Sequence, residues 1–565
     1  MLAAVAAALR AHPELALFLT LAVGHAIGRV RIGPLRMNPS IGVLLVGIAV
    51  GQIGVEVPKP VQWSFYVLFL FSIGFRSGPQ FFRSLGRGSI PQVLLAILLG
   101  GTSLGCALLL ARIFGLDPGG AAGFFAGSMT SAAAVGTAGE AIARLPGTEA
   151  ARRALSDHLN VVFAVTYVVG LVGEIGILTW LGPRLMRVDL AAECRKLEAE
   201  MGVTKQEFGV VPASREWGAR AYAIPETFTV GTAADLERRF APARVFVERI
   251  RTATGMRDAD PSSMLRPGDV VVLSGRREVL VGEENPLRHS EVEDRDLLDI
   301  PVVGVDVVLT RRELIGRTLA DAVRALEAEG LGRGVFGRAI RRGGNPIPTG
   351  PGTVLDRGDV LMLVGSRAQV ARVADRLGTA EWPSTSTDIV ILAAAIAVGG
   401  LIGLPTLRLM GLDVGLSMPV GVLLGGLAVG WLRSVRPVIA HVPEPALWLL
   451  DSLGLTAFIA TVGIGAGQGF FEGLKTAGLA LIAGAVLIRL VPNVLTILAG
   501  RYVLRVHPGV LLGVCAGAGS SSTALTAVND KAESQIPTLG YGISYAVGTV
   551  LLTLGGTFIV AAMAR

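Results

Sequence analysis

The charged residues of this chain are concentrated in its middle third. Residues 184–383 contain 30 Lys and Arg and 30 Asp and Glu, whereas the remaining 365 positions contain 21 basic and 14 acidic residues. The flanking segments are too apolar for soluble domains, and the mean hydropathy of the whole chain is +0.59. We therefore expect an α-helical polytopic membrane protein in which membrane blocks at 1–183 and 384–565 flank a soluble α/β insert.

The net charge of +7 arises outside the insert, in short loops between apolar stretches. Basic residues in such loops orient a membrane protein, so they do not indicate a nucleic-acid-binding surface. The three cysteines, Cys106, Cys194 and Cys515, lack the spacing of a zinc site or a disulfide framework. The histidines are equally scattered. The sequence therefore predicts that the protein binds no metal or cofactor and is not an enzyme.

Each membrane block contains six apolar stretches that approach the roughly 20 residues needed to cross a hydrocarbon core. They lie near 13–31, 40–55, 61–75, 90–114, 119–143 and 159–182 in the first block, and near 388–404, 415–432, 446–469, 476–500, 509–528 and 539–563 in the second.

The two blocks also resemble each other, with the segment from Pro39 to Gly51 matching the segment from Pro419 to Gly430. Further matches keep the same order, with Gly74, Gly78, Phe81, Phe82, Ala126, Gly127, Tyr167 and Gly170 corresponding to Gly463, Gly467, Phe470, Phe471, Ala516, Gly517, Tyr545 and Gly548. Internal duplication in a membrane protein is typical of transporters.

The loop charges indicate that these two repeats are inverted. Basic loops follow the first and third stretches of the first block but the second and fourth of the second block, at Arg29, Arg31, Arg36, Arg76, Arg83, Arg87, Arg433, Arg436, Arg501 and Arg505. Because Lys and Arg mark cytoplasmic loops, we expect an external amino terminus and a cytoplasmic insert.

Inversion requires an odd number of crossings per repeat, so one of the six stretches in each block must not cross as a simple helix. The fifth stretches are the best candidates, because 126–136 and 516–525 are rich in Gly, Ser and Thr. We expect re-entrant hairpins or broken helices that meet near the membrane midplane. Close helix packing by small residues is the alternative.

The insert contains two tandem copies of a small domain, expected at 205–284 and 297–380. Met264–Gly275 recurs 90 positions later as Val354–Gly365, a Gly-Asp turn that leads into a buried strand. This arrangement resembles the regulatory RCK-C or TrkA-C domain attached to potassium channels, more fully in the second copy. The resemblance implies a regulatory or dimerising insert, with a homodimer and a small regulatory ligand as expected partners.

A glycine pattern in the second copy formally matches a dinucleotide-binding fingerprint, at Gly332, Gly334 and Gly337. That fingerprint requires a strand before the glycines and a helix after them. Here the expected helix precedes the glycines and a strand follows. We therefore interpret Gly330 and Gly332 as residues that end a helix rather than as part of a cofactor site.

Ionisable residues inside apolar stretches are costly, so each is a candidate functional residue. Arg76 lies between two glycines at the end of a crossing, and its guanidinium has the bidentate geometry that suits a carboxylate solute. A role as a cytoplasmic anchor is the alternative. Arg489 lies within another stretch and either neutralises a dianionic solute or pairs with an internal acid such as Glu174 or Asp451.

Further candidates for substrate binding are polar and uncharged or acidic. Hydroxyl groups in the two fifth stretches could donate to a carboxylate, at Ser128, Thr130, Ser131, Ser520, Ser521, Ser522 and Thr523. Gln468 and Asn529 could orient an amino group. Asp530 could bind an ammonium group or a proton, unless it lies in a hydrated loop beside Lys531.

Together these segments resemble the aspartate:alanine exchanger family of bacterial inner-membrane antiporters. The resemblance covers essentially the whole chain and rests on the two central copies and on the segments GFRSGPQFF, AGSMTSAA, AGAGSSSTA and ISYAVGTVLLTLGG. It implies an elevator-type, inverted-repeat transporter. The implied activity is exchange of a small carboxylate or amino acid, of the aspartate/alanine or dicarboxylate class.

The residues alone leave two other functions open. A cation channel or cation–proton exchanger gated by the central domains would depend on Asp530, Glu174 and Asp451 rather than on Arg76. A membrane sensor would keep the carrier fold, show no flux and bind a ligand in the insert.

Overall fold

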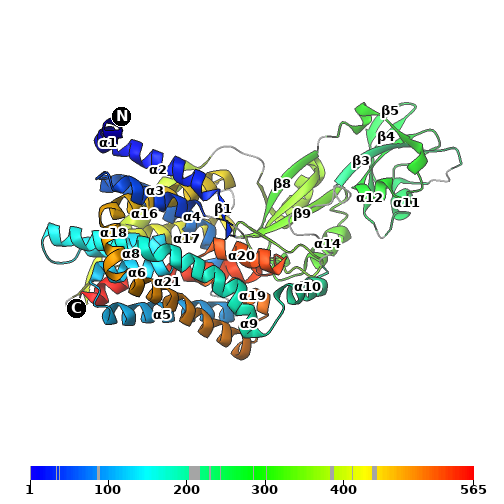
Figure 1. The fold of residues 1–565 in the computed structure, drawn as a ribbon. Coiled ribbons are helices and arrows are strands. Elements are labelled where there is room, and N and C mark those ends of the chain that lie inside the picture. Colours follow the sequence, from blue (N-terminus) through cyan, green and yellow to red (C-terminus); the bar gives the residue numbers. More distant parts are fainter. Residues whose placement is uncertain are drawn as a thin grey trace. The chain divides into compact units, whose positions relative to one another are not determined.

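The computed structural model describes residues 2–32, 35–36, 38–84, 89–202, 217–227, 231–241, 243–283, 285–300, 302–381, 387–409, 412–415, 417–435 and 442–564. The chain divides into two compact units, a helical one and one that contains the sheets of the insert (Figure 1). The helical unit comprises Met1–Leu197, Gly343–Asn345 and Thr385–Arg565. The predicted boundaries at 205, 284 and 384, and the loop residues Arg87 and Arg436, lie outside the described residues.

The first half of the helical unit contains α1 (Leu2–Ala11), α2 (Pro13–Gly28), α3 (Pro39–Gly51), α4 (Lys59–Ser84), α5 (Ile90–Ile113), α6 (Pro118–Ser128), α7 (Ala132–Ala143), α8 (Glu149–Gly176), α9 (Gly182–Met186) and α10 (Leu190–Glu200). The second half contains α16 (Ile389–Gly403), α17 (Met418–Val435), α18 (Glu444–Leu498), α19 (Pro508–Ala518), α20 (Ser522–Ala532) and α21 (Thr538–Met563). A two-stranded hairpin precedes α3 and another precedes α17, formed by β1 (Arg31–Ile32), β2 (Leu35–Arg36), β13 (Thr406–Leu409) and β14 (Leu412–Gly415).

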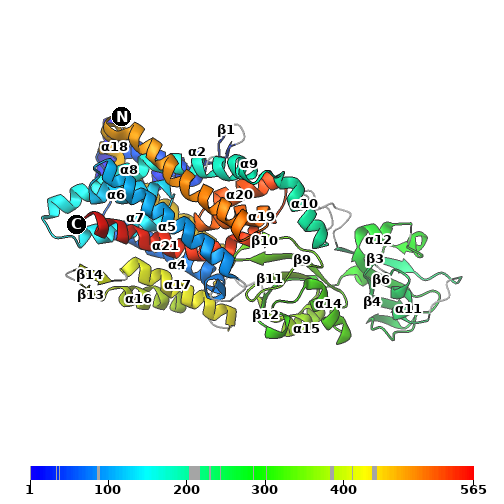
Figure 2. The ribbon, with the colours of Figure 1, turned by 90° about the horizontal axis from the view of Figure 1, so that it is seen from below.

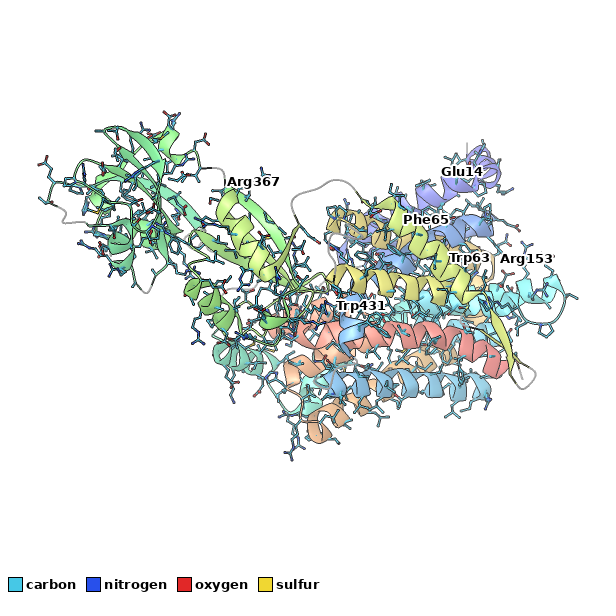
Figure 3. The ribbon with its side chains drawn as sticks, turned by 180° about the vertical axis from the view of Figure 1, so that it is seen from behind. Glu14, Trp63, Phe65, Arg153, Arg367 and Trp431 are labelled. Atoms are coloured by element: carbon cyan, nitrogen blue, oxygen red, sulfur yellow. The ribbon has the colours of Figure 1, made fainter. Side chains whose placement is uncertain are left out.

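Six helical segments among the described residues are long and apolar enough to cross a membrane, or seven if the bent pair α1 and α2 counts as one. They are Ile90–Ile113, Glu149–Met186, Met418–Val435, Glu444–Lys475, Gly478–Val503 and Thr538–Met563. Figure 3 places Trp63 and Arg153 near one end of the helical unit and Trp431 toward the other end. Trp at both ends of a bundle is typical of membrane interfaces.

The long element α18 contains two of these segments and turns back between them. The ring of Phe458 stacks on Tyr66, with 4.6 Å between ring centroids, and the Tyr66 hydroxyl donates to the carbonyl oxygen of Ala133. Arg489, on the second segment, donates to the carbonyl oxygen of Ser128, close to Ala133 in the chain. A straight helix would separate residues 458 and 489 by about 46 Å. The two segments therefore pass the same level in opposite directions.

The fifth apolar stretch of each repeat is broken, as the sequence predicts. Three residues separate α6 from α7, and three separate α19 from α20. Thr130 and Ser520, at equivalent positions in the two breaks, have left-handed φ angles of 51° and 54°. Ser131 and Ser521 then cap the following helices, each accepting a hydrogen bond from the backbone N–H three residues on.

Each broken stretch is a re-entrant hairpin. Gly123 on α6 and Gly139 on α7 both lie against Leu159 of α8, so the chain follows α8 to the break and then returns. In the second repeat, Gly513 on α19 and Asn529 on α20 both contact the start of α21. We call residues 128–131 the first tip and residues 519–521 the second tip.

The order of contacts along α8 and α21 shows that the repeats are inverted. Helix α8 packs along its own hairpin and then reaches the second tip, where Glu174 lies against Gly519. Helix α21 packs along its own hairpin and then reaches the first one, where its Thr553 carbonyl accepts a hydrogen bond from Thr137. Each helix meets its own hairpin first, so the two helices run in opposite directions.

The glycines that match between the repeats allow close helix crossings. A Cβ atom on Gly78 of α4 would lie 2.4 Å from the backbone oxygen of Leu427 on α17, and one on Gly467 of α18 would lie 2.5 Å from the Cα of Gly51 on α3. In both crossings the third apolar stretch of one repeat meets the second apolar stretch of the other. Small residues at such crossings are typical of membrane helices.

The insert contains two domains of the same topology (Figure 2). The strand orders are β5-β4-β6-β3-β7 and β10-β9-β11-β8-β12. The first domain contains β3 (Trp217–Ala223), α11 (Ala233–Arg238), β4 (Val245–Thr252), β5 (Gly255–Asp258), β6 (Val270–Arg276), α12 (Arg277–Val281), β7 (Glu291–Val292) and α13 (Arg295–Leu298). The second contains β8 (Val302–Leu309), α14 (Leu319–Ala328), β9 (Val335–Arg342), β10 (Asn345–Ile347), β11 (Val360–Ser366), α15 (Arg367–Leu377) and β12 (Gly378–Glu381).

Candidate functional site

A fully buried ion pair lies where the two hairpin tips meet. Glu174 on α8 and Arg489 on α18 are each 0% exposed, and Oε1 of Glu174 lies 3.0 Å from Nη1 of Arg489. Arg489 also donates from Nε to the Ser128 carbonyl at 2.6 Å and from Nη2 to the Thr130 hydroxyl at 2.8 Å. A guanidinium of the second repeat therefore holds the first tip.

The same ion pair fills the space beside the second tip. A Cβ atom on Gly519 would lie 2.2 Å from Oε1 of Glu174 and 3.0 Å from Nη1 of Arg489. Glycine is therefore the residue that leaves room for the two charges. The first repeat thus supplies a carboxylate to the second tip, and the second repeat supplies a cation to the first.

Several polar atoms at this crossing are buried without hydrogen bonds. Among the described residues, both carboxylate oxygens of Glu174, Nη1 of Arg489 and Oγ of Ser128 have no hydrogen-bond partner. The contact between Glu174 and Arg489 has the distance of an ion pair but not the angles of a hydrogen bond. Buried polar atoms are costly unless a protein group, water or a ligand bonds them, so these atoms can accept or donate further hydrogen bonds.

Five of the seven predicted hydroxyl residues lie at the tips. Besides the contacts above, Ser520 shares a hydrogen bond of 2.8 Å with the hydroxyl of Thr549 on α21. Thr130 and Ser520 are partly exposed, whereas the other three are buried. The remaining two begin α20, where Ser522 is exposed and Thr523 accepts a hydrogen bond from Asn38 at 2.7 Å.

The other uncharged and acidic candidates lie away from the tips. Gln468 is exposed on the first segment of α18, near the end of α3. Asn529 is buried near the end of α20 and donates to Gln535 and Thr538. Asp530 follows it and is exposed. The structure therefore does not bring these three residues to the buried ion pair.

Arg76 is paired with acids of the second repeat. Its Nη2 lies 2.7 Å from Oε1 of Glu444, and its Nη1 lies 3.9 Å from Oδ2 of Asp451, both on α18. Its side chain is 24% exposed. The guanidinium is thus more accessible than that of Arg489, but it is not the isolated cation that the sequence suggested.

The helix that carries Arg76 runs antiparallel to α21. Gln80 packs against Gly542 near the start of α21. Tyr66, earlier on α4, donates to Ala133 of α7, and the next residue of α7 packs against Gly556 near the end of α21. Residues later on α4 therefore lie beside residues earlier on α21.

This direction places Arg76 at the level of the part of α21 between Gly542 and Thr549. Arg76 lies one turn before Gln80, so it faces the part of α21 that follows Gly542 and approaches Thr549. Gly542 and Thr549 are seven positions apart, or about 10 Å along α21. Thr549 of α21 shares a hydrogen bond with Ser520, so α4 with Arg76 and the second tip both pack against α21.

The sequence predicts Glu174 and Arg489 as a possible pair, but neither is among the predicted substrate-binding residues. Their signal is an isolated charge inside an apolar stretch, which the pair shares with Arg76. Gly519 and Thr549 carried no such signal, because glycine and threonine are common in membrane helices. Their roles follow from the packing of the tips.

Comparison with known proteins agrees with this architecture. The family profile Asp-Al_Ex, described as "Predicted Permease Membrane Region", matches residues 16–183 and 391–561. The chain belongs to the aspartate:alanine exchanger family. A second profile, for the TrkA-C domain, matches residues 302–378, and the first domain of the insert shares the strand order of that matched domain. No solved structure matches the chain.

Relatives in this family are described as uncharacterized transporters. One from Bordetella parapertussis is 38% identical over 566 residues, which cover 99% of this chain and 98% of the relative. Relatives from Shewanella oneidensis and Zymomonas mobilis are 37% and 34% identical, with 98% of both chains covered in each case. This exchanger-family member is therefore a multi-pass membrane transporter.

Proposed function

We propose that this transporter is a secondary antiporter that exchanges small carboxylates or amino acids across the bacterial inner membrane, with the insert in the cytoplasm. The observation that carries the proposal is Arg76, a partly exposed guanidinium on α4, which packs along α21, the helix whose Thr549 bonds Ser520 of the second tip. A fixed cation beside neutral donors suits a carboxylate with further polar groups. The aspartate/alanine and dicarboxylate classes both fit this chemistry.

In this proposal a substrate carboxylate replaces Glu444 on Arg76. The guanidinium has five donors in a planar fork, and Glu444 engages only Nη2 at hydrogen-bond distance. Its Nε has no hydrogen-bond partner among the described residues. Bidentate binding of a substrate would satisfy more of these donors than the present pair does. Thr130 and Ser520, the partly exposed hydroxyls of the tips, are then available to the rest of the solute.

The replacement of Glu444 by a substrate on Arg76 also explains why transport would require a counter-substrate. Arg76 belongs to the first repeat and Glu444 to the second, so their ion pair joins the repeats. A substrate that takes the guanidinium releases this connection and favours states in which the repeats have moved. A ligand shifts a conformational equilibrium only through such differential binding. The empty protein keeps the connection and interconverts slowly.

The proposal is tested with purified protein in liposomes. Liposomes preloaded with alanine should take up labelled aspartate much faster than empty liposomes, and a dicarboxylate panel extends the test to the second substrate class. Arg76→Lys should slow uptake, because lysine keeps the charge but loses the planar fork. Arg153→Lys is the matched control, since Arg153 pairs with Glu56 at an exposed site. Equal uptake with and without internal solute would contradict exchange.

A cation pathway is the second candidate, favoured by the buried carboxylate of Glu174 at the crossing. Carboxylate oxygens are typical groups of ion and proton pathways inside membranes. This function predicts sodium, potassium or proton flux in liposomes that contain no organic solute. It also predicts that Glu174→Gln abolishes this flux while Arg76→Lys leaves it unchanged.

A further inference from the structure

The second domain of the insert contains an apolar cavity with two opposite charges at its edge. The cavity has a volume of about 230 Å³ and lies between α14 and the sheet. Its walls include Leu326, Leu363 and Leu377. Among the described residues that line it, Arg244 and Glu327 are the ionisable ones.

The cavity exists because the second domain lacks side chains that fill the first. The strand registers pair Val247 with Leu273 in the first domain and Gly337 with Leu363 in the second, at equivalent positions. Val247 is 1% exposed in the core of its domain. A Cβ atom on Gly337 would meet nothing within 4 Å. The second sheet is therefore open where the first is packed.

The helix side of the second domain also has a smaller side chain than that of the first domain. Thr232 and Thr318 cap α11 and α14 through identical capping boxes, which aligns the two helices. In that alignment Phe240, part of the packed core of the first domain, corresponds to Leu326. A smaller side chain thus faces the space that Gly337 leaves. Two substitutions on opposite walls open one domain of the tandem pair and leave the other closed.

The charges at the edge come from both domains. Arg244 of the first domain donates to the carbonyl oxygen of Gly332 at 2.9 Å, and its guanidinium lies 3.6 Å from Glu327 of the second domain. The side chains of Arg244 and Glu327 are 39% and 48% exposed, so both can be reached by a ligand. Gly332 and Gly337, two members of the formal glycine pattern, line the cavity.

We propose that this cavity binds a free amino acid with an apolar side chain. Arg244 would receive the α-carboxylate, Glu327 would receive the ammonium group, and the apolar walls would bury the side chain. A zwitterion is the small molecule that matches an opposite pair of charges at the edge of an apolar recess. The volume is below the range of about 300–1,000 Å³ found for drug-sized ligands, which indicates a small occupant. This proposal does not rest on the identity of the transported solute.

The test uses leucine as the probe and the full-length protein purified in detergent, with binding measured by calorimetry. We expect saturable binding that Gly337→Val weakens at least tenfold, because the valine of the closed domain is placed in the open one. Arg244→Ala should have an effect of similar size and leaves the apolar walls of the cavity unchanged. Gly304→Val is the matched control, since Gly304 is an exposed strand glycine of the same domain outside the cavity.

Two analogues separate the contributions of the charges. Leucinamide lacks the carboxylate and 4-methylpentanoate lacks the ammonium group, and each should bind at least tenfold more weakly than leucine. If leucinamide binds as tightly as leucine, the assignment of the carboxylate to Arg244 is wrong. If 4-methylpentanoate binds as tightly as leucine, the assignment of the ammonium group to Glu327 is wrong. Leucine binding that is absent, or that survives both Gly337→Val and Arg244→Ala, would overturn the site itself. Aspartate uptake in the same variants reports separately on transport.

Discussion

The carboxylate of Glu174 and the guanidinium of Arg489 lie 3.0 Å apart, both fully buried, and connect the hairpin tips of two inverted repeats. Each side chain comes from the repeat opposite to the tip that it approaches. Removal of one partner would leave an uncompensated charge in a site without exposure to solvent. The pair therefore couples the two hairpins.

We expect Glu174→Gln and Arg489→Met each to destabilise the protein by about 3–5 kcal/mol, the cost of breaking a buried pair. The double substitution should be less harmful than the sum of the single ones, because no charge then remains buried alone. Thermal unfolding of the purified proteins measures both effects. Additive losses in the double variant would show that the two charges do not depend on each other.

Gly519→Ala should disturb the ion pair without removing either charge. The new methyl group would meet Oε1 of Glu174 at 2.2 Å, so the carboxylate must move. We expect transport to fall about tenfold, which corresponds to roughly 1.4 kcal/mol in the barrier. Gly101→Ala on α5 is the control, because a Cβ atom there meets nothing within 4 Å. An equal response of both variants would mean that the contact at Gly519 has no special role.

Arg76→Lys and Glu444→Gln should change substrate affinity in opposite directions. Lysine loses the bidentate fork, so under the proposed function the KM for a carboxylate substrate should rise about tenfold, in the range of one charged hydrogen bond. Glutamine removes the charge that competes for Arg76, so the KM should fall. The rates of uptake over a range of substrate concentrations give both values. A rise in KM for both variants would indicate that the pair has a structural role only.

The sequence predicted the broken fifth stretches correctly because their composition opposes a continuous helix. Gly, Ser and Thr cluster there, and Thr130 and Ser520 occupy left-handed conformations at matching positions. Inversion was also predictable, since loop charges reverse between the blocks. These features are local or follow from the order of residues, so no knowledge of tertiary packing was required.

The partners of the charged residues were harder to predict. Arg76 has the same sequence signal whether it is free or paired, and Glu444 lies 368 positions away. Gln468, Asn529 and Asp530 have suitable chemistry but lie away from the tips. Which polar residues meet depends on how α18 turns back and how the hairpins pack. Those are long-range contacts that a single sequence does not specify.

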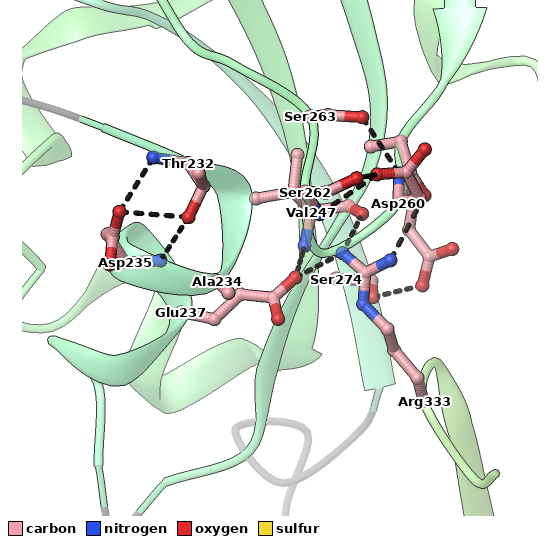
Figure 4. A network of polar contacts seen from close by, with 12 residues as sticks. Thr232, Ala234, Asp235, Glu237, Val247, Asp260, Ser262, Ser263, Ser274 and Arg333 are labelled. Atoms are coloured by element: carbon pink, nitrogen blue, oxygen red, sulfur yellow. Dashed lines mark hydrogen bonds and ion pairs between the residues drawn. The ribbon is translucent and has the colours of Figure 1, made fainter. Parts of the chain in front are cut away.

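Arg333 should fix the two domains of the insert to each other. It extends from the second domain to the first, where it pairs with Glu237 and donates to the carbonyl oxygens of Val247 and Ala259 at 3.0 Å each (Figure 4). Arg333→Lys should loosen this contact, because one ammonium group does not span three acceptors. Hydrogen exchange of β4 in the full-length protein should then rise about tenfold or more. Arg338→Lys, at an exposed position of the second domain, is the control. Unchanged exchange in the Arg333 variant would show that other contacts hold the domains together.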